Sequence, residues 1–440
     1  MRLTIVGGGG FRVPLVYSAV AQARHRVPIT EVVLTDTDPT RLEAIESVLT
    51  GMGFDLPLST TTSLDDALGG AACVFAAIRV GGTQGRINDE RVALSHGLLG
   101  QETIGPGGLA YAIRTLAVME DLAQRVARLC PQAWIINFTN PAGLITQAML
   151  DHHPRVVGIC DTPIGLVRRV ARVLGQDVEA ADIGYLGINH LGWLKSFTVD
   201  GVDHLQGLLA DPQRLAQIEE ARTLGVPWVQ TMGAIPNEYV YYYHYTREVV
   251  ATLSGAGATR GEFLDTQQTR FYTTPHDHPH QTLGAWRQTL REREETYMAE
   301  ARDQARQEED ISGGYHEVAV DLMAGVLAGE HNRMILGVAN RGAIPQLPQQ
   351  ATVEVVCQVD EHGVHPIHPT PQLDLDHIGL IIQVKAAEQE LIAAVRAGSQ
   401  KSAWRAFASH PLVDSVAVAR DLVQDYIHTD PLIARALPNE

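Results

Sequence analysis

Four consecutive glycines at residues 7–10 separate a short apolar segment from a helical pattern. A strand, a glycine turn and a helix in this order let the backbone approach a pyrophosphate, whose charge the helix N-terminus stabilises. Asp36 closes the next apolar segment, 36 − 10 = 26 residues past the last glycine, and is placed to bind ribose hydroxyls. The spacing departs from G-x-G-x-x-G, because Val13 stands where helix packing favours glycine. A plain turn of an α/β protein is the alternative.

The pattern predicts a site for NAD rather than NADP, since the Asp36 carboxylate would repel a 2′-phosphate. Arg12 follows the glycines and is a candidate for the pyrophosphate or for another anionic group. The predicted cofactor-binding residues are Gly7, Gly8, Gly9, Gly10, Phe11, Arg12 and Asp36.

Cys160 and His190 are residue types that bind transition metals. Cys160 directly follows the apolar segment at 156–159, and His190 lies between two strand-like segments. The gap of 190 − 160 = 30 residues is not a local metal motif. Taken by themselves, the two residues are better interpreted as a buried thiol and a core histidine.

Tyr239 is the best candidate for a general base in the tyrosine-rich segment at 237–245. A phenol with an ordinary pKa near ~10 is a poor base at neutral pH, but a neighbouring cation favours its phenolate. The segment is expected to begin a helix with Tyr239, Tyr242 and Tyr243 on one face. The alternative is aromatic packing, which we favour for Tyr241 and Tyr243.

The candidate site residues are far apart in the sequence, and a parallel sheet could bring them together at the ends of its strands. Near-continuous apolar segments alternate with helical patterns in the first half, which predicts a doubly wound, Rossmann-like α/β sheet covered on both faces. The expected strands are 3–6, 31–35, 73–78, 134–138 and 156–159, and the expected helices include 13–23, 39–51 and 108–130. Ligands of such sheets bind at the carboxyl ends of the strands.

The alternation changes after about residue 200. A polar helical stretch extends to about 223, and further helical patterns occupy 287–309, 317–327 and 376–397. We therefore predict a Rossmann-like NAD-binding domain at 1–199, followed by an α+β substrate and catalytic domain at 200–440. The histidines at 276, 278 and 280 lie among prolines and are interpreted as a solvated loop.

The composition excludes several classes of protein. With 51 acidic and 34 basic residues the formal charge is −17, which disfavours nucleic acids and anionic membranes as partners. An anionic ligand would therefore need local arginines. Four scattered cysteines do not form a disulfide framework, and neither a transmembrane segment nor a signal peptide is evident. We expect a cytoplasmic protein.

Five ordered segments carry a more specific signal. They are GRINDERVALSHGLLGQETIGPGG (85–108), WIINFTNPAGLITQAM (134–149), GICDTPIGL (158–166), GINHLGWL (187–194) and IPNEYVYYY (235–243). Together they resemble glycoside hydrolase family 4, whose members require NAD and a divalent metal, and are most similar to its 6-phospho-β-glucosidases. The resemblance extends over nearly the whole chain.

The resemblance implies an unusual hydrolysis that departs from the two-carboxylate mechanism. NAD⁺ removes hydride from C3 of the sugar, a base removes the acidified C2 proton, and the glycosidic oxygen leaves. Water then adds to C1 and the retained NADH returns the hydride. Cys160 and His190 match the ligands of the metal, usually Mn²⁺, and Tyr239 matches the base. Asp161 matches a position whose acid is proposed to protonate the leaving oxygen in α-specific members.

The resemblance also assigns substrate-binding residues. Asn140 should reach sugar hydroxyls or the metal region, and Arg86 and Arg260 match positions that contact substrate and phosphate. Arginine suits phosphate because its planar fork donates two parallel hydrogen bonds. The chain departs from the family at Arg12, because phosphate-specific members carry hydroxyl-rich residues after the glycines.

The expected partner is therefore a small phosphorylated glucoside, and the expected assembly is a homodimer or homotetramer. Two other activities stay open from the sequence: a 6-phospho-α-glucosidase of the same family, and an NAD-dependent, malate-like dehydrogenase.

Overall fold

The strands of both halves of the chain belong to one sheet. The computed structural model describes residues 1–274, 276–296, 314–368 and 371–438. Its strands are β1 (Arg2–Val6), β2 (Glu31–Thr35), β3 (Leu58–Thr61), β4 (Ala71–Ala76), β5 (Trp134–Asn137), β6 (Val156–Gly158), β7 (Asp182–Ile188), β8 (Leu191–Val199), β9 (Val202–Asp203), β10 (Ile235–Pro236), β11 (Asn332–Ala339), β12 (Thr352–Asp360) and β13 (Gly363–Pro366). The order is β10-β8-β7-β12-β11-β6-β5-β4-β1-β2-β3, with β13 beside β12 and β9 beside β8.

The side of the sheet from β3 to β6 is entirely parallel. Apart from the edge strand β3, its strands are apolar and buried nearly throughout, as expected when helices cover both faces of a parallel sheet. The predicted doubly wound α/β fold is confirmed, and each of the five predicted strands is present within one or two residues.

The other side of the sheet is antiparallel. β11 joins β6 at the pair Gly337↔Gly158, and β12 connects β11 to the β7–β8 hairpin. Strands from beyond residue 330 therefore lie between two strands from before residue 200. The division of the chain near residue 199 stays a prediction.

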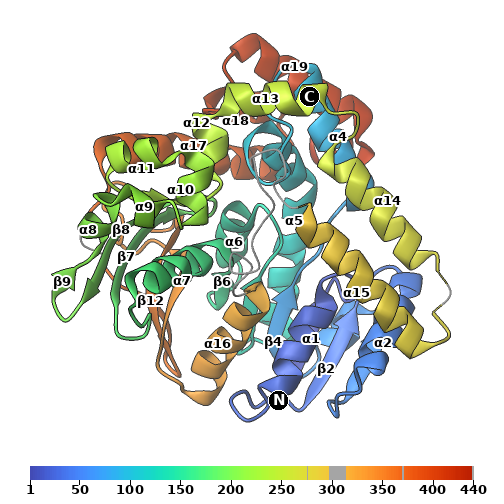
Figure 1. Cartoon of the computed structure of the whole chain (residues 1–440). Helices are drawn as coiled ribbons and strands as arrows, with labels where there is room; N and C mark the ends of the chain where they lie inside the picture. The colour runs from blue at the N-terminus through green and yellow to red at the C-terminus, as the bar shows by residue number, and fades with distance from the viewer. Residues whose placement is uncertain (275, 297–313, 369–370, 439–440) are drawn as a thin grey trace.

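Helices cover this sheet and the carboxyl ends of its parallel strands (Figure 1). They are α1 (Val13–Gln22), α2 (Pro39–Met52), α3 (Leu64–Leu68), α4 (Gly82–Ser95), α5 (Gly105–Leu129), α6 (Ala142–Leu150), α7 (Thr162–Leu174), α8 (Leu205–Leu209), α9 (Pro212–Leu215), α10 (Glu219–Leu224), α11 (Val226–Met232), α12 (Val240–His244), α13 (Thr246–Gly255), α14 (Arg260–Tyr272), α15 (Pro279–Glu295), α16 (Tyr315–Ala328), α17 (Leu375–Ala397), α18 (Gln400–Ser409), α19 (Val416–Thr429) and α20 (Pro431–Ala436).

Two expected helices differ from the structure. The polar stretch up to residue 223 forms several short helices, because Asp211 accepts two backbone N–H groups as an N-cap and Pro212 then begins a new helix. The helix expected at 287–309 is confirmed up to Glu295 as the end of α15, and positions 297–313 lie outside the described residues.

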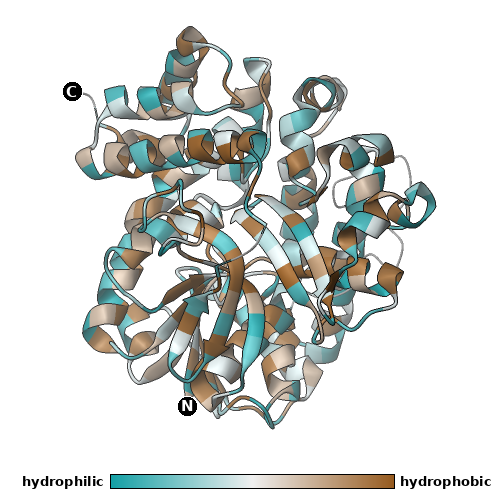
Figure 2. Ribbon diagram, turned by 90° about the vertical axis from the view of Figure 1, so that its left-hand side faces the viewer, coloured by the Kyte–Doolittle hydropathy of each residue, from teal (hydrophilic) through white to brown (hydrophobic). Residues whose placement is uncertain are grey.

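The core has two main parts. One includes both sides of the sheet, and the other packs α5 and α6 against α17–α20. Figure 2 shows brown, hydrophobic segments along the central strands, and brown and teal segments alternating along the surrounding helices. Among the described residues, no helix has the length and apolarity needed to cross a bilayer.

Candidate active site

A cavity of about 920 Å³ opens at the carboxyl ends of the parallel strands. It brings together most of the site residues predicted from the sequence. Those that line it are Gly7, Gly10, Phe11, Arg12, Asp36, Arg86, Asn140, Cys160, Asp161, His190, Tyr239 and Arg260. Gly8 and Gly9 are outside the lining, and so are the three histidines at 276, 278 and 280.

The glycine turn is folded tightly against β2. The Gly7 and Gly8 N–H groups both donate to the backbone carbonyl oxygen of Thr35, at 2.9 and 2.8 Å. The Gly9 N–H donates to Asp36 Oδ2 at 3.0 Å. A Cβ on Gly8 would lie 2.6 Å from the Leu34 Cβ, so this residue serves close packing. The turn thus holds Asp36 beside the start of α1, whose first turn has no acidic residue.

Phe11 and Arg12, which follow the glycines, have different surroundings in the site. Phe11 is 4% exposed, and its ring packs between Phe271 and Trp286 at centroid distances of 5.5 and 6.0 Å. Within the described part of the chain, its N–H at the start of α1 makes no hydrogen bond. The Arg12 guanidinium lies over the ring of Tyr315, 5.2 Å from its centroid. A helix N-terminus beside an arginine fits an anionic group such as a pyrophosphate.

Cys160 and His190 reach the cavity from different strands. Cys160 follows β6, and its thiol lies 3.3 Å from Thr162 Oγ1. Burial, with Glu354 and Asp161 nearby, raises the thiol pKa well above its usual range. His190 occupies the turn between β7 and β8 with φ 63°, a left-handed conformation that is uncommon for histidine and often found at functional sites.

The His190 side chain has the properties of an available ligand. Burial lowers its pKa to about 3, so the imidazole is neutral. Its Nδ1 is buried and has no hydrogen-bond partner among the residues that the structure describes. A neutral imidazole and a thiol lining one cavity fit a divalent transition metal. The described residues contain no group of three or more His, Cys, Asp or Glu side chains that could hold a metal, so this pair would leave coordination positions open.

Tyr239 stacks on His190, with ring centroids 3.8 Å apart and planes at 11°. It precedes α12 and is 8% exposed. Its N–H donates to Asn237 Oδ1 at 3.0 Å, and Asn237 Nδ2 donates to Thr162 Oγ1 at 2.7 Å. Because Thr162 also contacts Cys160, Asn237 joins the tyrosine to the thiol. Asn237 was not among the site residues predicted from the sequence.

Glu354 is a second residue that the sequence analysis missed. It lies on β12, is 2% exposed, and accepts hydrogen bonds from Tyr185 Oη and Asn189 Nδ2, both at 3.2 Å. Burial raises the pKa of its carboxyl group to about 7. The available signal was a lone glutamate in an apolar strand, since a buried carboxyl group needs partners.

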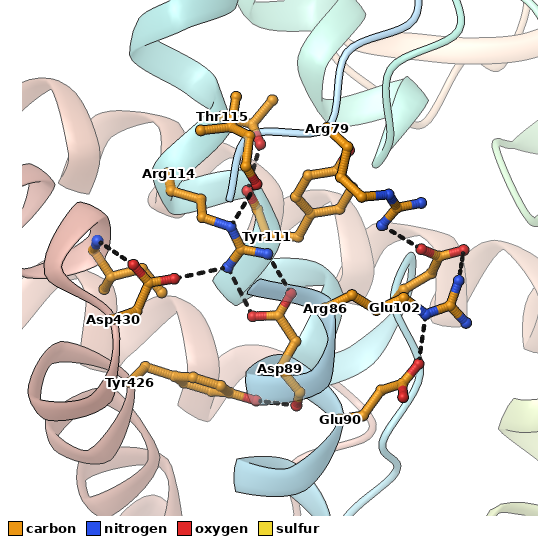
Figure 3. Close-up of polar contacts among 12 residues, drawn as sticks. Arg79, Arg86, Asp89, Glu90, Glu102, Tyr111, Arg114, Thr115, Tyr426 and Asp430 are labelled. Carbon is orange, nitrogen blue, oxygen red and sulfur yellow. Dashed lines mark hydrogen bonds and ion pairs between the residues drawn. The ribbon is translucent and has the colours of Figure 1, made fainter. Parts of the chain in front are cut away.

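Arg86 is held by carboxylates on the cavity wall (Figure 3). Its guanidinium contacts Glu90 Oε1 and Glu102 Oε1, each at 2.7 Å, and Arg79 forms an ion pair with the other oxygen of Glu102. Burial raises the pKa of Glu102, but Arg79 and Arg86 outweigh this effect and hold the pKa at about 2. Arg86 is therefore locked in place and largely neutralised.

Arg260 and Arg293 form the candidate anion-binding side of the cavity. Arg260 begins α14, and its Nη2 donates to the backbone carbonyl oxygen of Arg293 at 2.8 Å. Arg293, near the end of α15, also lines the cavity. Burial, followed by the charges of Arg12 and Arg260, lowers the pKa of Arg293 well below its usual range. An anion bound here would relieve this repulsion.

Asn140 and Asp161 complete the lining at two strand ends. Asn140 follows β5, whereas the neighbouring Asn137 is fully buried and bonded to three acceptors of its own loop and of α6, as expected for a structural residue. Asp161 precedes α7 and makes no side-chain capping bond to it.

Comparison with known proteins identifies the family. The family described as family 4 glycosyl hydrolase matches residues 2–176, and its C-terminal domain matches residues 185–413. The chain is 28% identical to a probable 6-phospho-β-glucosidase of Bacillus subtilis, over 97% of this chain and 96% of that protein.

Two solved structures extend the comparison. The 6-phospho-β-glucosidase of Thermotoga maritima with NAD and glucose-6-phosphate superimposes with a TM-score of 0.83 at 25% identity, covering 98% of both chains. A 6-phospho-α-glucosidase from gut microorganisms with NAD and Mn²⁺ gives 0.80 at 26% identity, covering 97% of both. The expected family is thus confirmed by sequence and by structure, and this chain belongs to the family 4 glycosyl hydrolases.

Proposed function

We propose that this glycosyl hydrolase acts on β-glucosides that carry a phosphate at C6, with NAD and a divalent metal as resident cofactors. The observation that carries the proposal is the stacking of Tyr239 on His190 in a cavity that also contains the glycine turn and the arginines. A base, a metal ligand, a nucleotide turn and an anion-binding side in one cavity fit an oxidative elimination better than direct displacement by two carboxylates.

The cofactor would lie along the start of α1. Gly7, Gly10 and the Phe11 backbone would face its pyrophosphate, Arg12 would add positive charge, and Asp36 would accept from the ribose hydroxyls. NAD supplies a hydride acceptor and donor for the sugar. The relatives of known structure that hold NAD support this assignment.

Cys160 and His190 would hold the metal, for which Mn²⁺ is our candidate because a relative of known structure contains it. Such an ion polarises sugar oxygens and makes the neighbouring C–H bonds more acidic. The role of the chain is to present a neutral imidazole and a thiol at a fixed position, with Asn237 and Thr162 supporting the thiol.

The remaining steps use side chains that line the cavity. Tyr239 takes the proton from C2, and its place against His190 fixes the direction of its hydroxyl group. Asn140 and Arg86 orient sugar hydroxyls. Arg260, with Arg293 and Arg12 beside it, binds the phosphate, which explains how a chain of formal charge −17 attracts an anionic substrate.

A 6-phospho-α-glucosidase activity is the second candidate, because Asp161 lines the cavity without capping α7 and could protonate a leaving oxygen. The test is turnover of nitrophenyl α- and β-glucoside 6-phosphates, and of their unphosphorylated forms, with NAD⁺ and Mn²⁺ under reducing conditions. We expect the phosphorylated β-glucoside to be hydrolysed fastest, without net formation of NADH. Faster turnover of the α-anomer would reverse the assignment, and accumulating NADH would indicate a dehydrogenase.

We also propose the setting in which the enzyme works. All four cysteines are buried and unpaired, which suits a reducing cytoplasm. A homodimer or homotetramer, and a division near residue 199 into a cofactor domain and a substrate domain, remain our proposals. Sedimentation of the purified protein tests the assembly.

A further inference from the structure

Three aromatic side chains from the second half of the chain contact the backbone of residues 9–12, at the end of the glycine turn. Each donates a hydrogen bond to a carbonyl group of the turn. The bonds join Tyr272 Oη to the Gly9 oxygen at 2.7 Å, Trp286 Nε1 to the Phe11 oxygen at 2.8 Å, and Tyr315 Oη to the Arg12 oxygen at 2.9 Å.

The three donors are fixed by packing. Trp286 is 3% exposed and lies against the Phe11 ring. Tyr315 stacks on Phe138, with centroids 4.1 Å apart and planes at 15°. The Arg41 guanidinium covers the ring of Tyr272 at 3.9 Å from its centroid. Because the rings cannot turn freely, their donor atoms define where the carbonyl groups must lie.

Fixing a carbonyl group also fixes the N–H group of the same peptide. The Gly10 and Val13 N–H groups, which share peptides with the Gly9 and Arg12 oxygens, donate to the Gly7 and Gly10 oxygens and so close the turn. A trans peptide is planar, and its N–H points opposite to its C=O. The bond from Trp286 to the Phe11 oxygen therefore sets the direction of the N–H of the next residue. Neither the Gly9 oxygen nor the Phe11 oxygen accepts a backbone N–H group within the described part of the chain, so the aromatic donors satisfy them.

We propose that Tyr272, Trp286 and Tyr315 are positioning residues for the dinucleotide, which hold the glycine turn in its binding conformation. This inference rests on the proposed NAD site. Tyr272 and Trp286 do not line the cavity, so an effect of either on the cofactor must pass through the turn or, for Tyr272, through Arg41, which does line it. They lie on α14 and α15, which also carry Arg260 and Arg293. The two helices therefore set the cofactor turn and the anion-binding side relative to each other.

The test measures the affinity of the full-length protein for NAD⁺ by titration calorimetry. The variants are Tyr272→Phe, Trp286→Phe and the double variant, because each single change removes one donor. Tyr245→Phe is the matched control, since its hydroxyl donates to the Leu224 oxygen at 2.6 Å. Glucose 6-phosphate binding without NAD⁺ is measured for every variant.

We expect each single variant to bind NAD⁺ about 3- to 10-fold more weakly, the effect of losing one hydrogen bond to the turn. The double variant should lose more than either, while Tyr245→Phe and all glucose 6-phosphate affinities stay within about twofold of wild type.

NAD⁺ affinities equal to wild type in Tyr272→Phe and in the double variant would overturn the inference. An equal loss of glucose 6-phosphate affinity would also overturn it, because the variants would then loosen the whole site. If the double variant does not fold, Tyr272→Phe alone decides, since it removes a single oxygen atom. The wild-type protein is measured before any variant. If it fails to bind NAD⁺, the proposed function is refuted instead.

Discussion

The imidazole of His190 lies parallel to the phenol ring of Tyr239, with the ring centroids 3.8 Å apart. The two residues are far apart in the chain, one in the β7–β8 turn and the other before α12. Their contact places a candidate metal ligand directly against the candidate base. A cation held by His190 would favour the phenolate of Tyr239, which is the form that accepts a proton.

The first prediction concerns that proton transfer. Turnover in D₂O should place deuterium at C2 of the product sugar, because C2 is acidic only after C3 has been oxidised. Mass spectrometry or NMR of the product measures this. A product without deuterium at C2 would rule out the elimination and leave direct displacement.

Tyr239→Phe should lower kcat by about 10²- to 10⁴-fold, the usual effect of losing one positioned base. The ring still stacks on His190, so the variant should fold and bind NAD⁺ normally. Absorbance of enzyme-bound NADH in the variant would show that C3 oxidation still proceeds. Tyr241→Phe is the control, because Tyr241 does not line the cavity. Equal kcat values for both variants would contradict the role of Tyr239.

The second prediction concerns the metal. A chelator should abolish activity, and Mn²⁺ should restore it in wild type but not in Cys160→Ser, because the hydroxyl group is a poorer ligand for a transition metal than a thiolate. Mn²⁺ binding, measured by electron paramagnetic resonance, should weaken in the variant. Cys130→Ser is the control, since Cys130 is a buried cysteine outside the cavity. Full activity of the metal-free protein would refute this site.

The third prediction concerns the anion-binding side. Arg260→Ala and Arg293→Ala should each raise KM for a phosphorylated glucoside by at least 10-fold, because each removes a charged partner of the phosphate. KM for an unphosphorylated glucoside should change little. Arg291→Ala, an exposed position on the same helix, should leave both values unchanged. Equal increases for both substrates would place the phosphate elsewhere, with Arg12 as the next residue to test.

The fourth prediction concerns a buried charge cluster beside the cavity (Figure 3). Arg114 contacts Asp89 at 2.5 Å and Asp430 at 3.3 Å, so two carboxylates share one guanidinium. Burial raises the pKa of Asp89, and this effect exceeds the lowering by Arg114. The charge of Asp430 raises the pKa further, and the result is a pKa of about 7. The folded chain therefore holds a proton on Asp89 over a range, about pH 4 to 7, in which the unfolded chain has lost it.

Because the folded state binds more protons there, the free energy of unfolding contributed by Asp89 should fall as pH rises from about 4 to about 7, and level off above that. Asp89→Asn removes this titration. The difference in unfolding free energy between wild type and the variant should therefore change from pH 5 to pH 7 and stay constant from pH 8 to pH 9. Denaturant unfolding measures it, with Asp66→Asn, an exposed position, as control. A difference independent of pH would refute the raised pKa.

The sequence by itself determined five of the six parallel strands and the identity of the family. Apolar strands alternating with helices have a local signature, and so does a glycine turn that precedes a helix. The motifs around Cys160, His190 and Tyr239 are contiguous segments, so they could be compared with a family without knowledge of their arrangement.

Only the tertiary structure decided which distant residues support the site. Glu354 approaches Asn189 because β12 lies beside β7, and Arg293 approaches Arg260 because α15 folds back along α14. The bonds from Tyr272 and Trp286 to the glycine turn span more than 250 residues. Such contacts depend on strand order and helix packing, which local periodicity does not encode. Their physical basis is the need of buried carbonyl groups and charges for partners, and only the assembled fold brings those partners within reach.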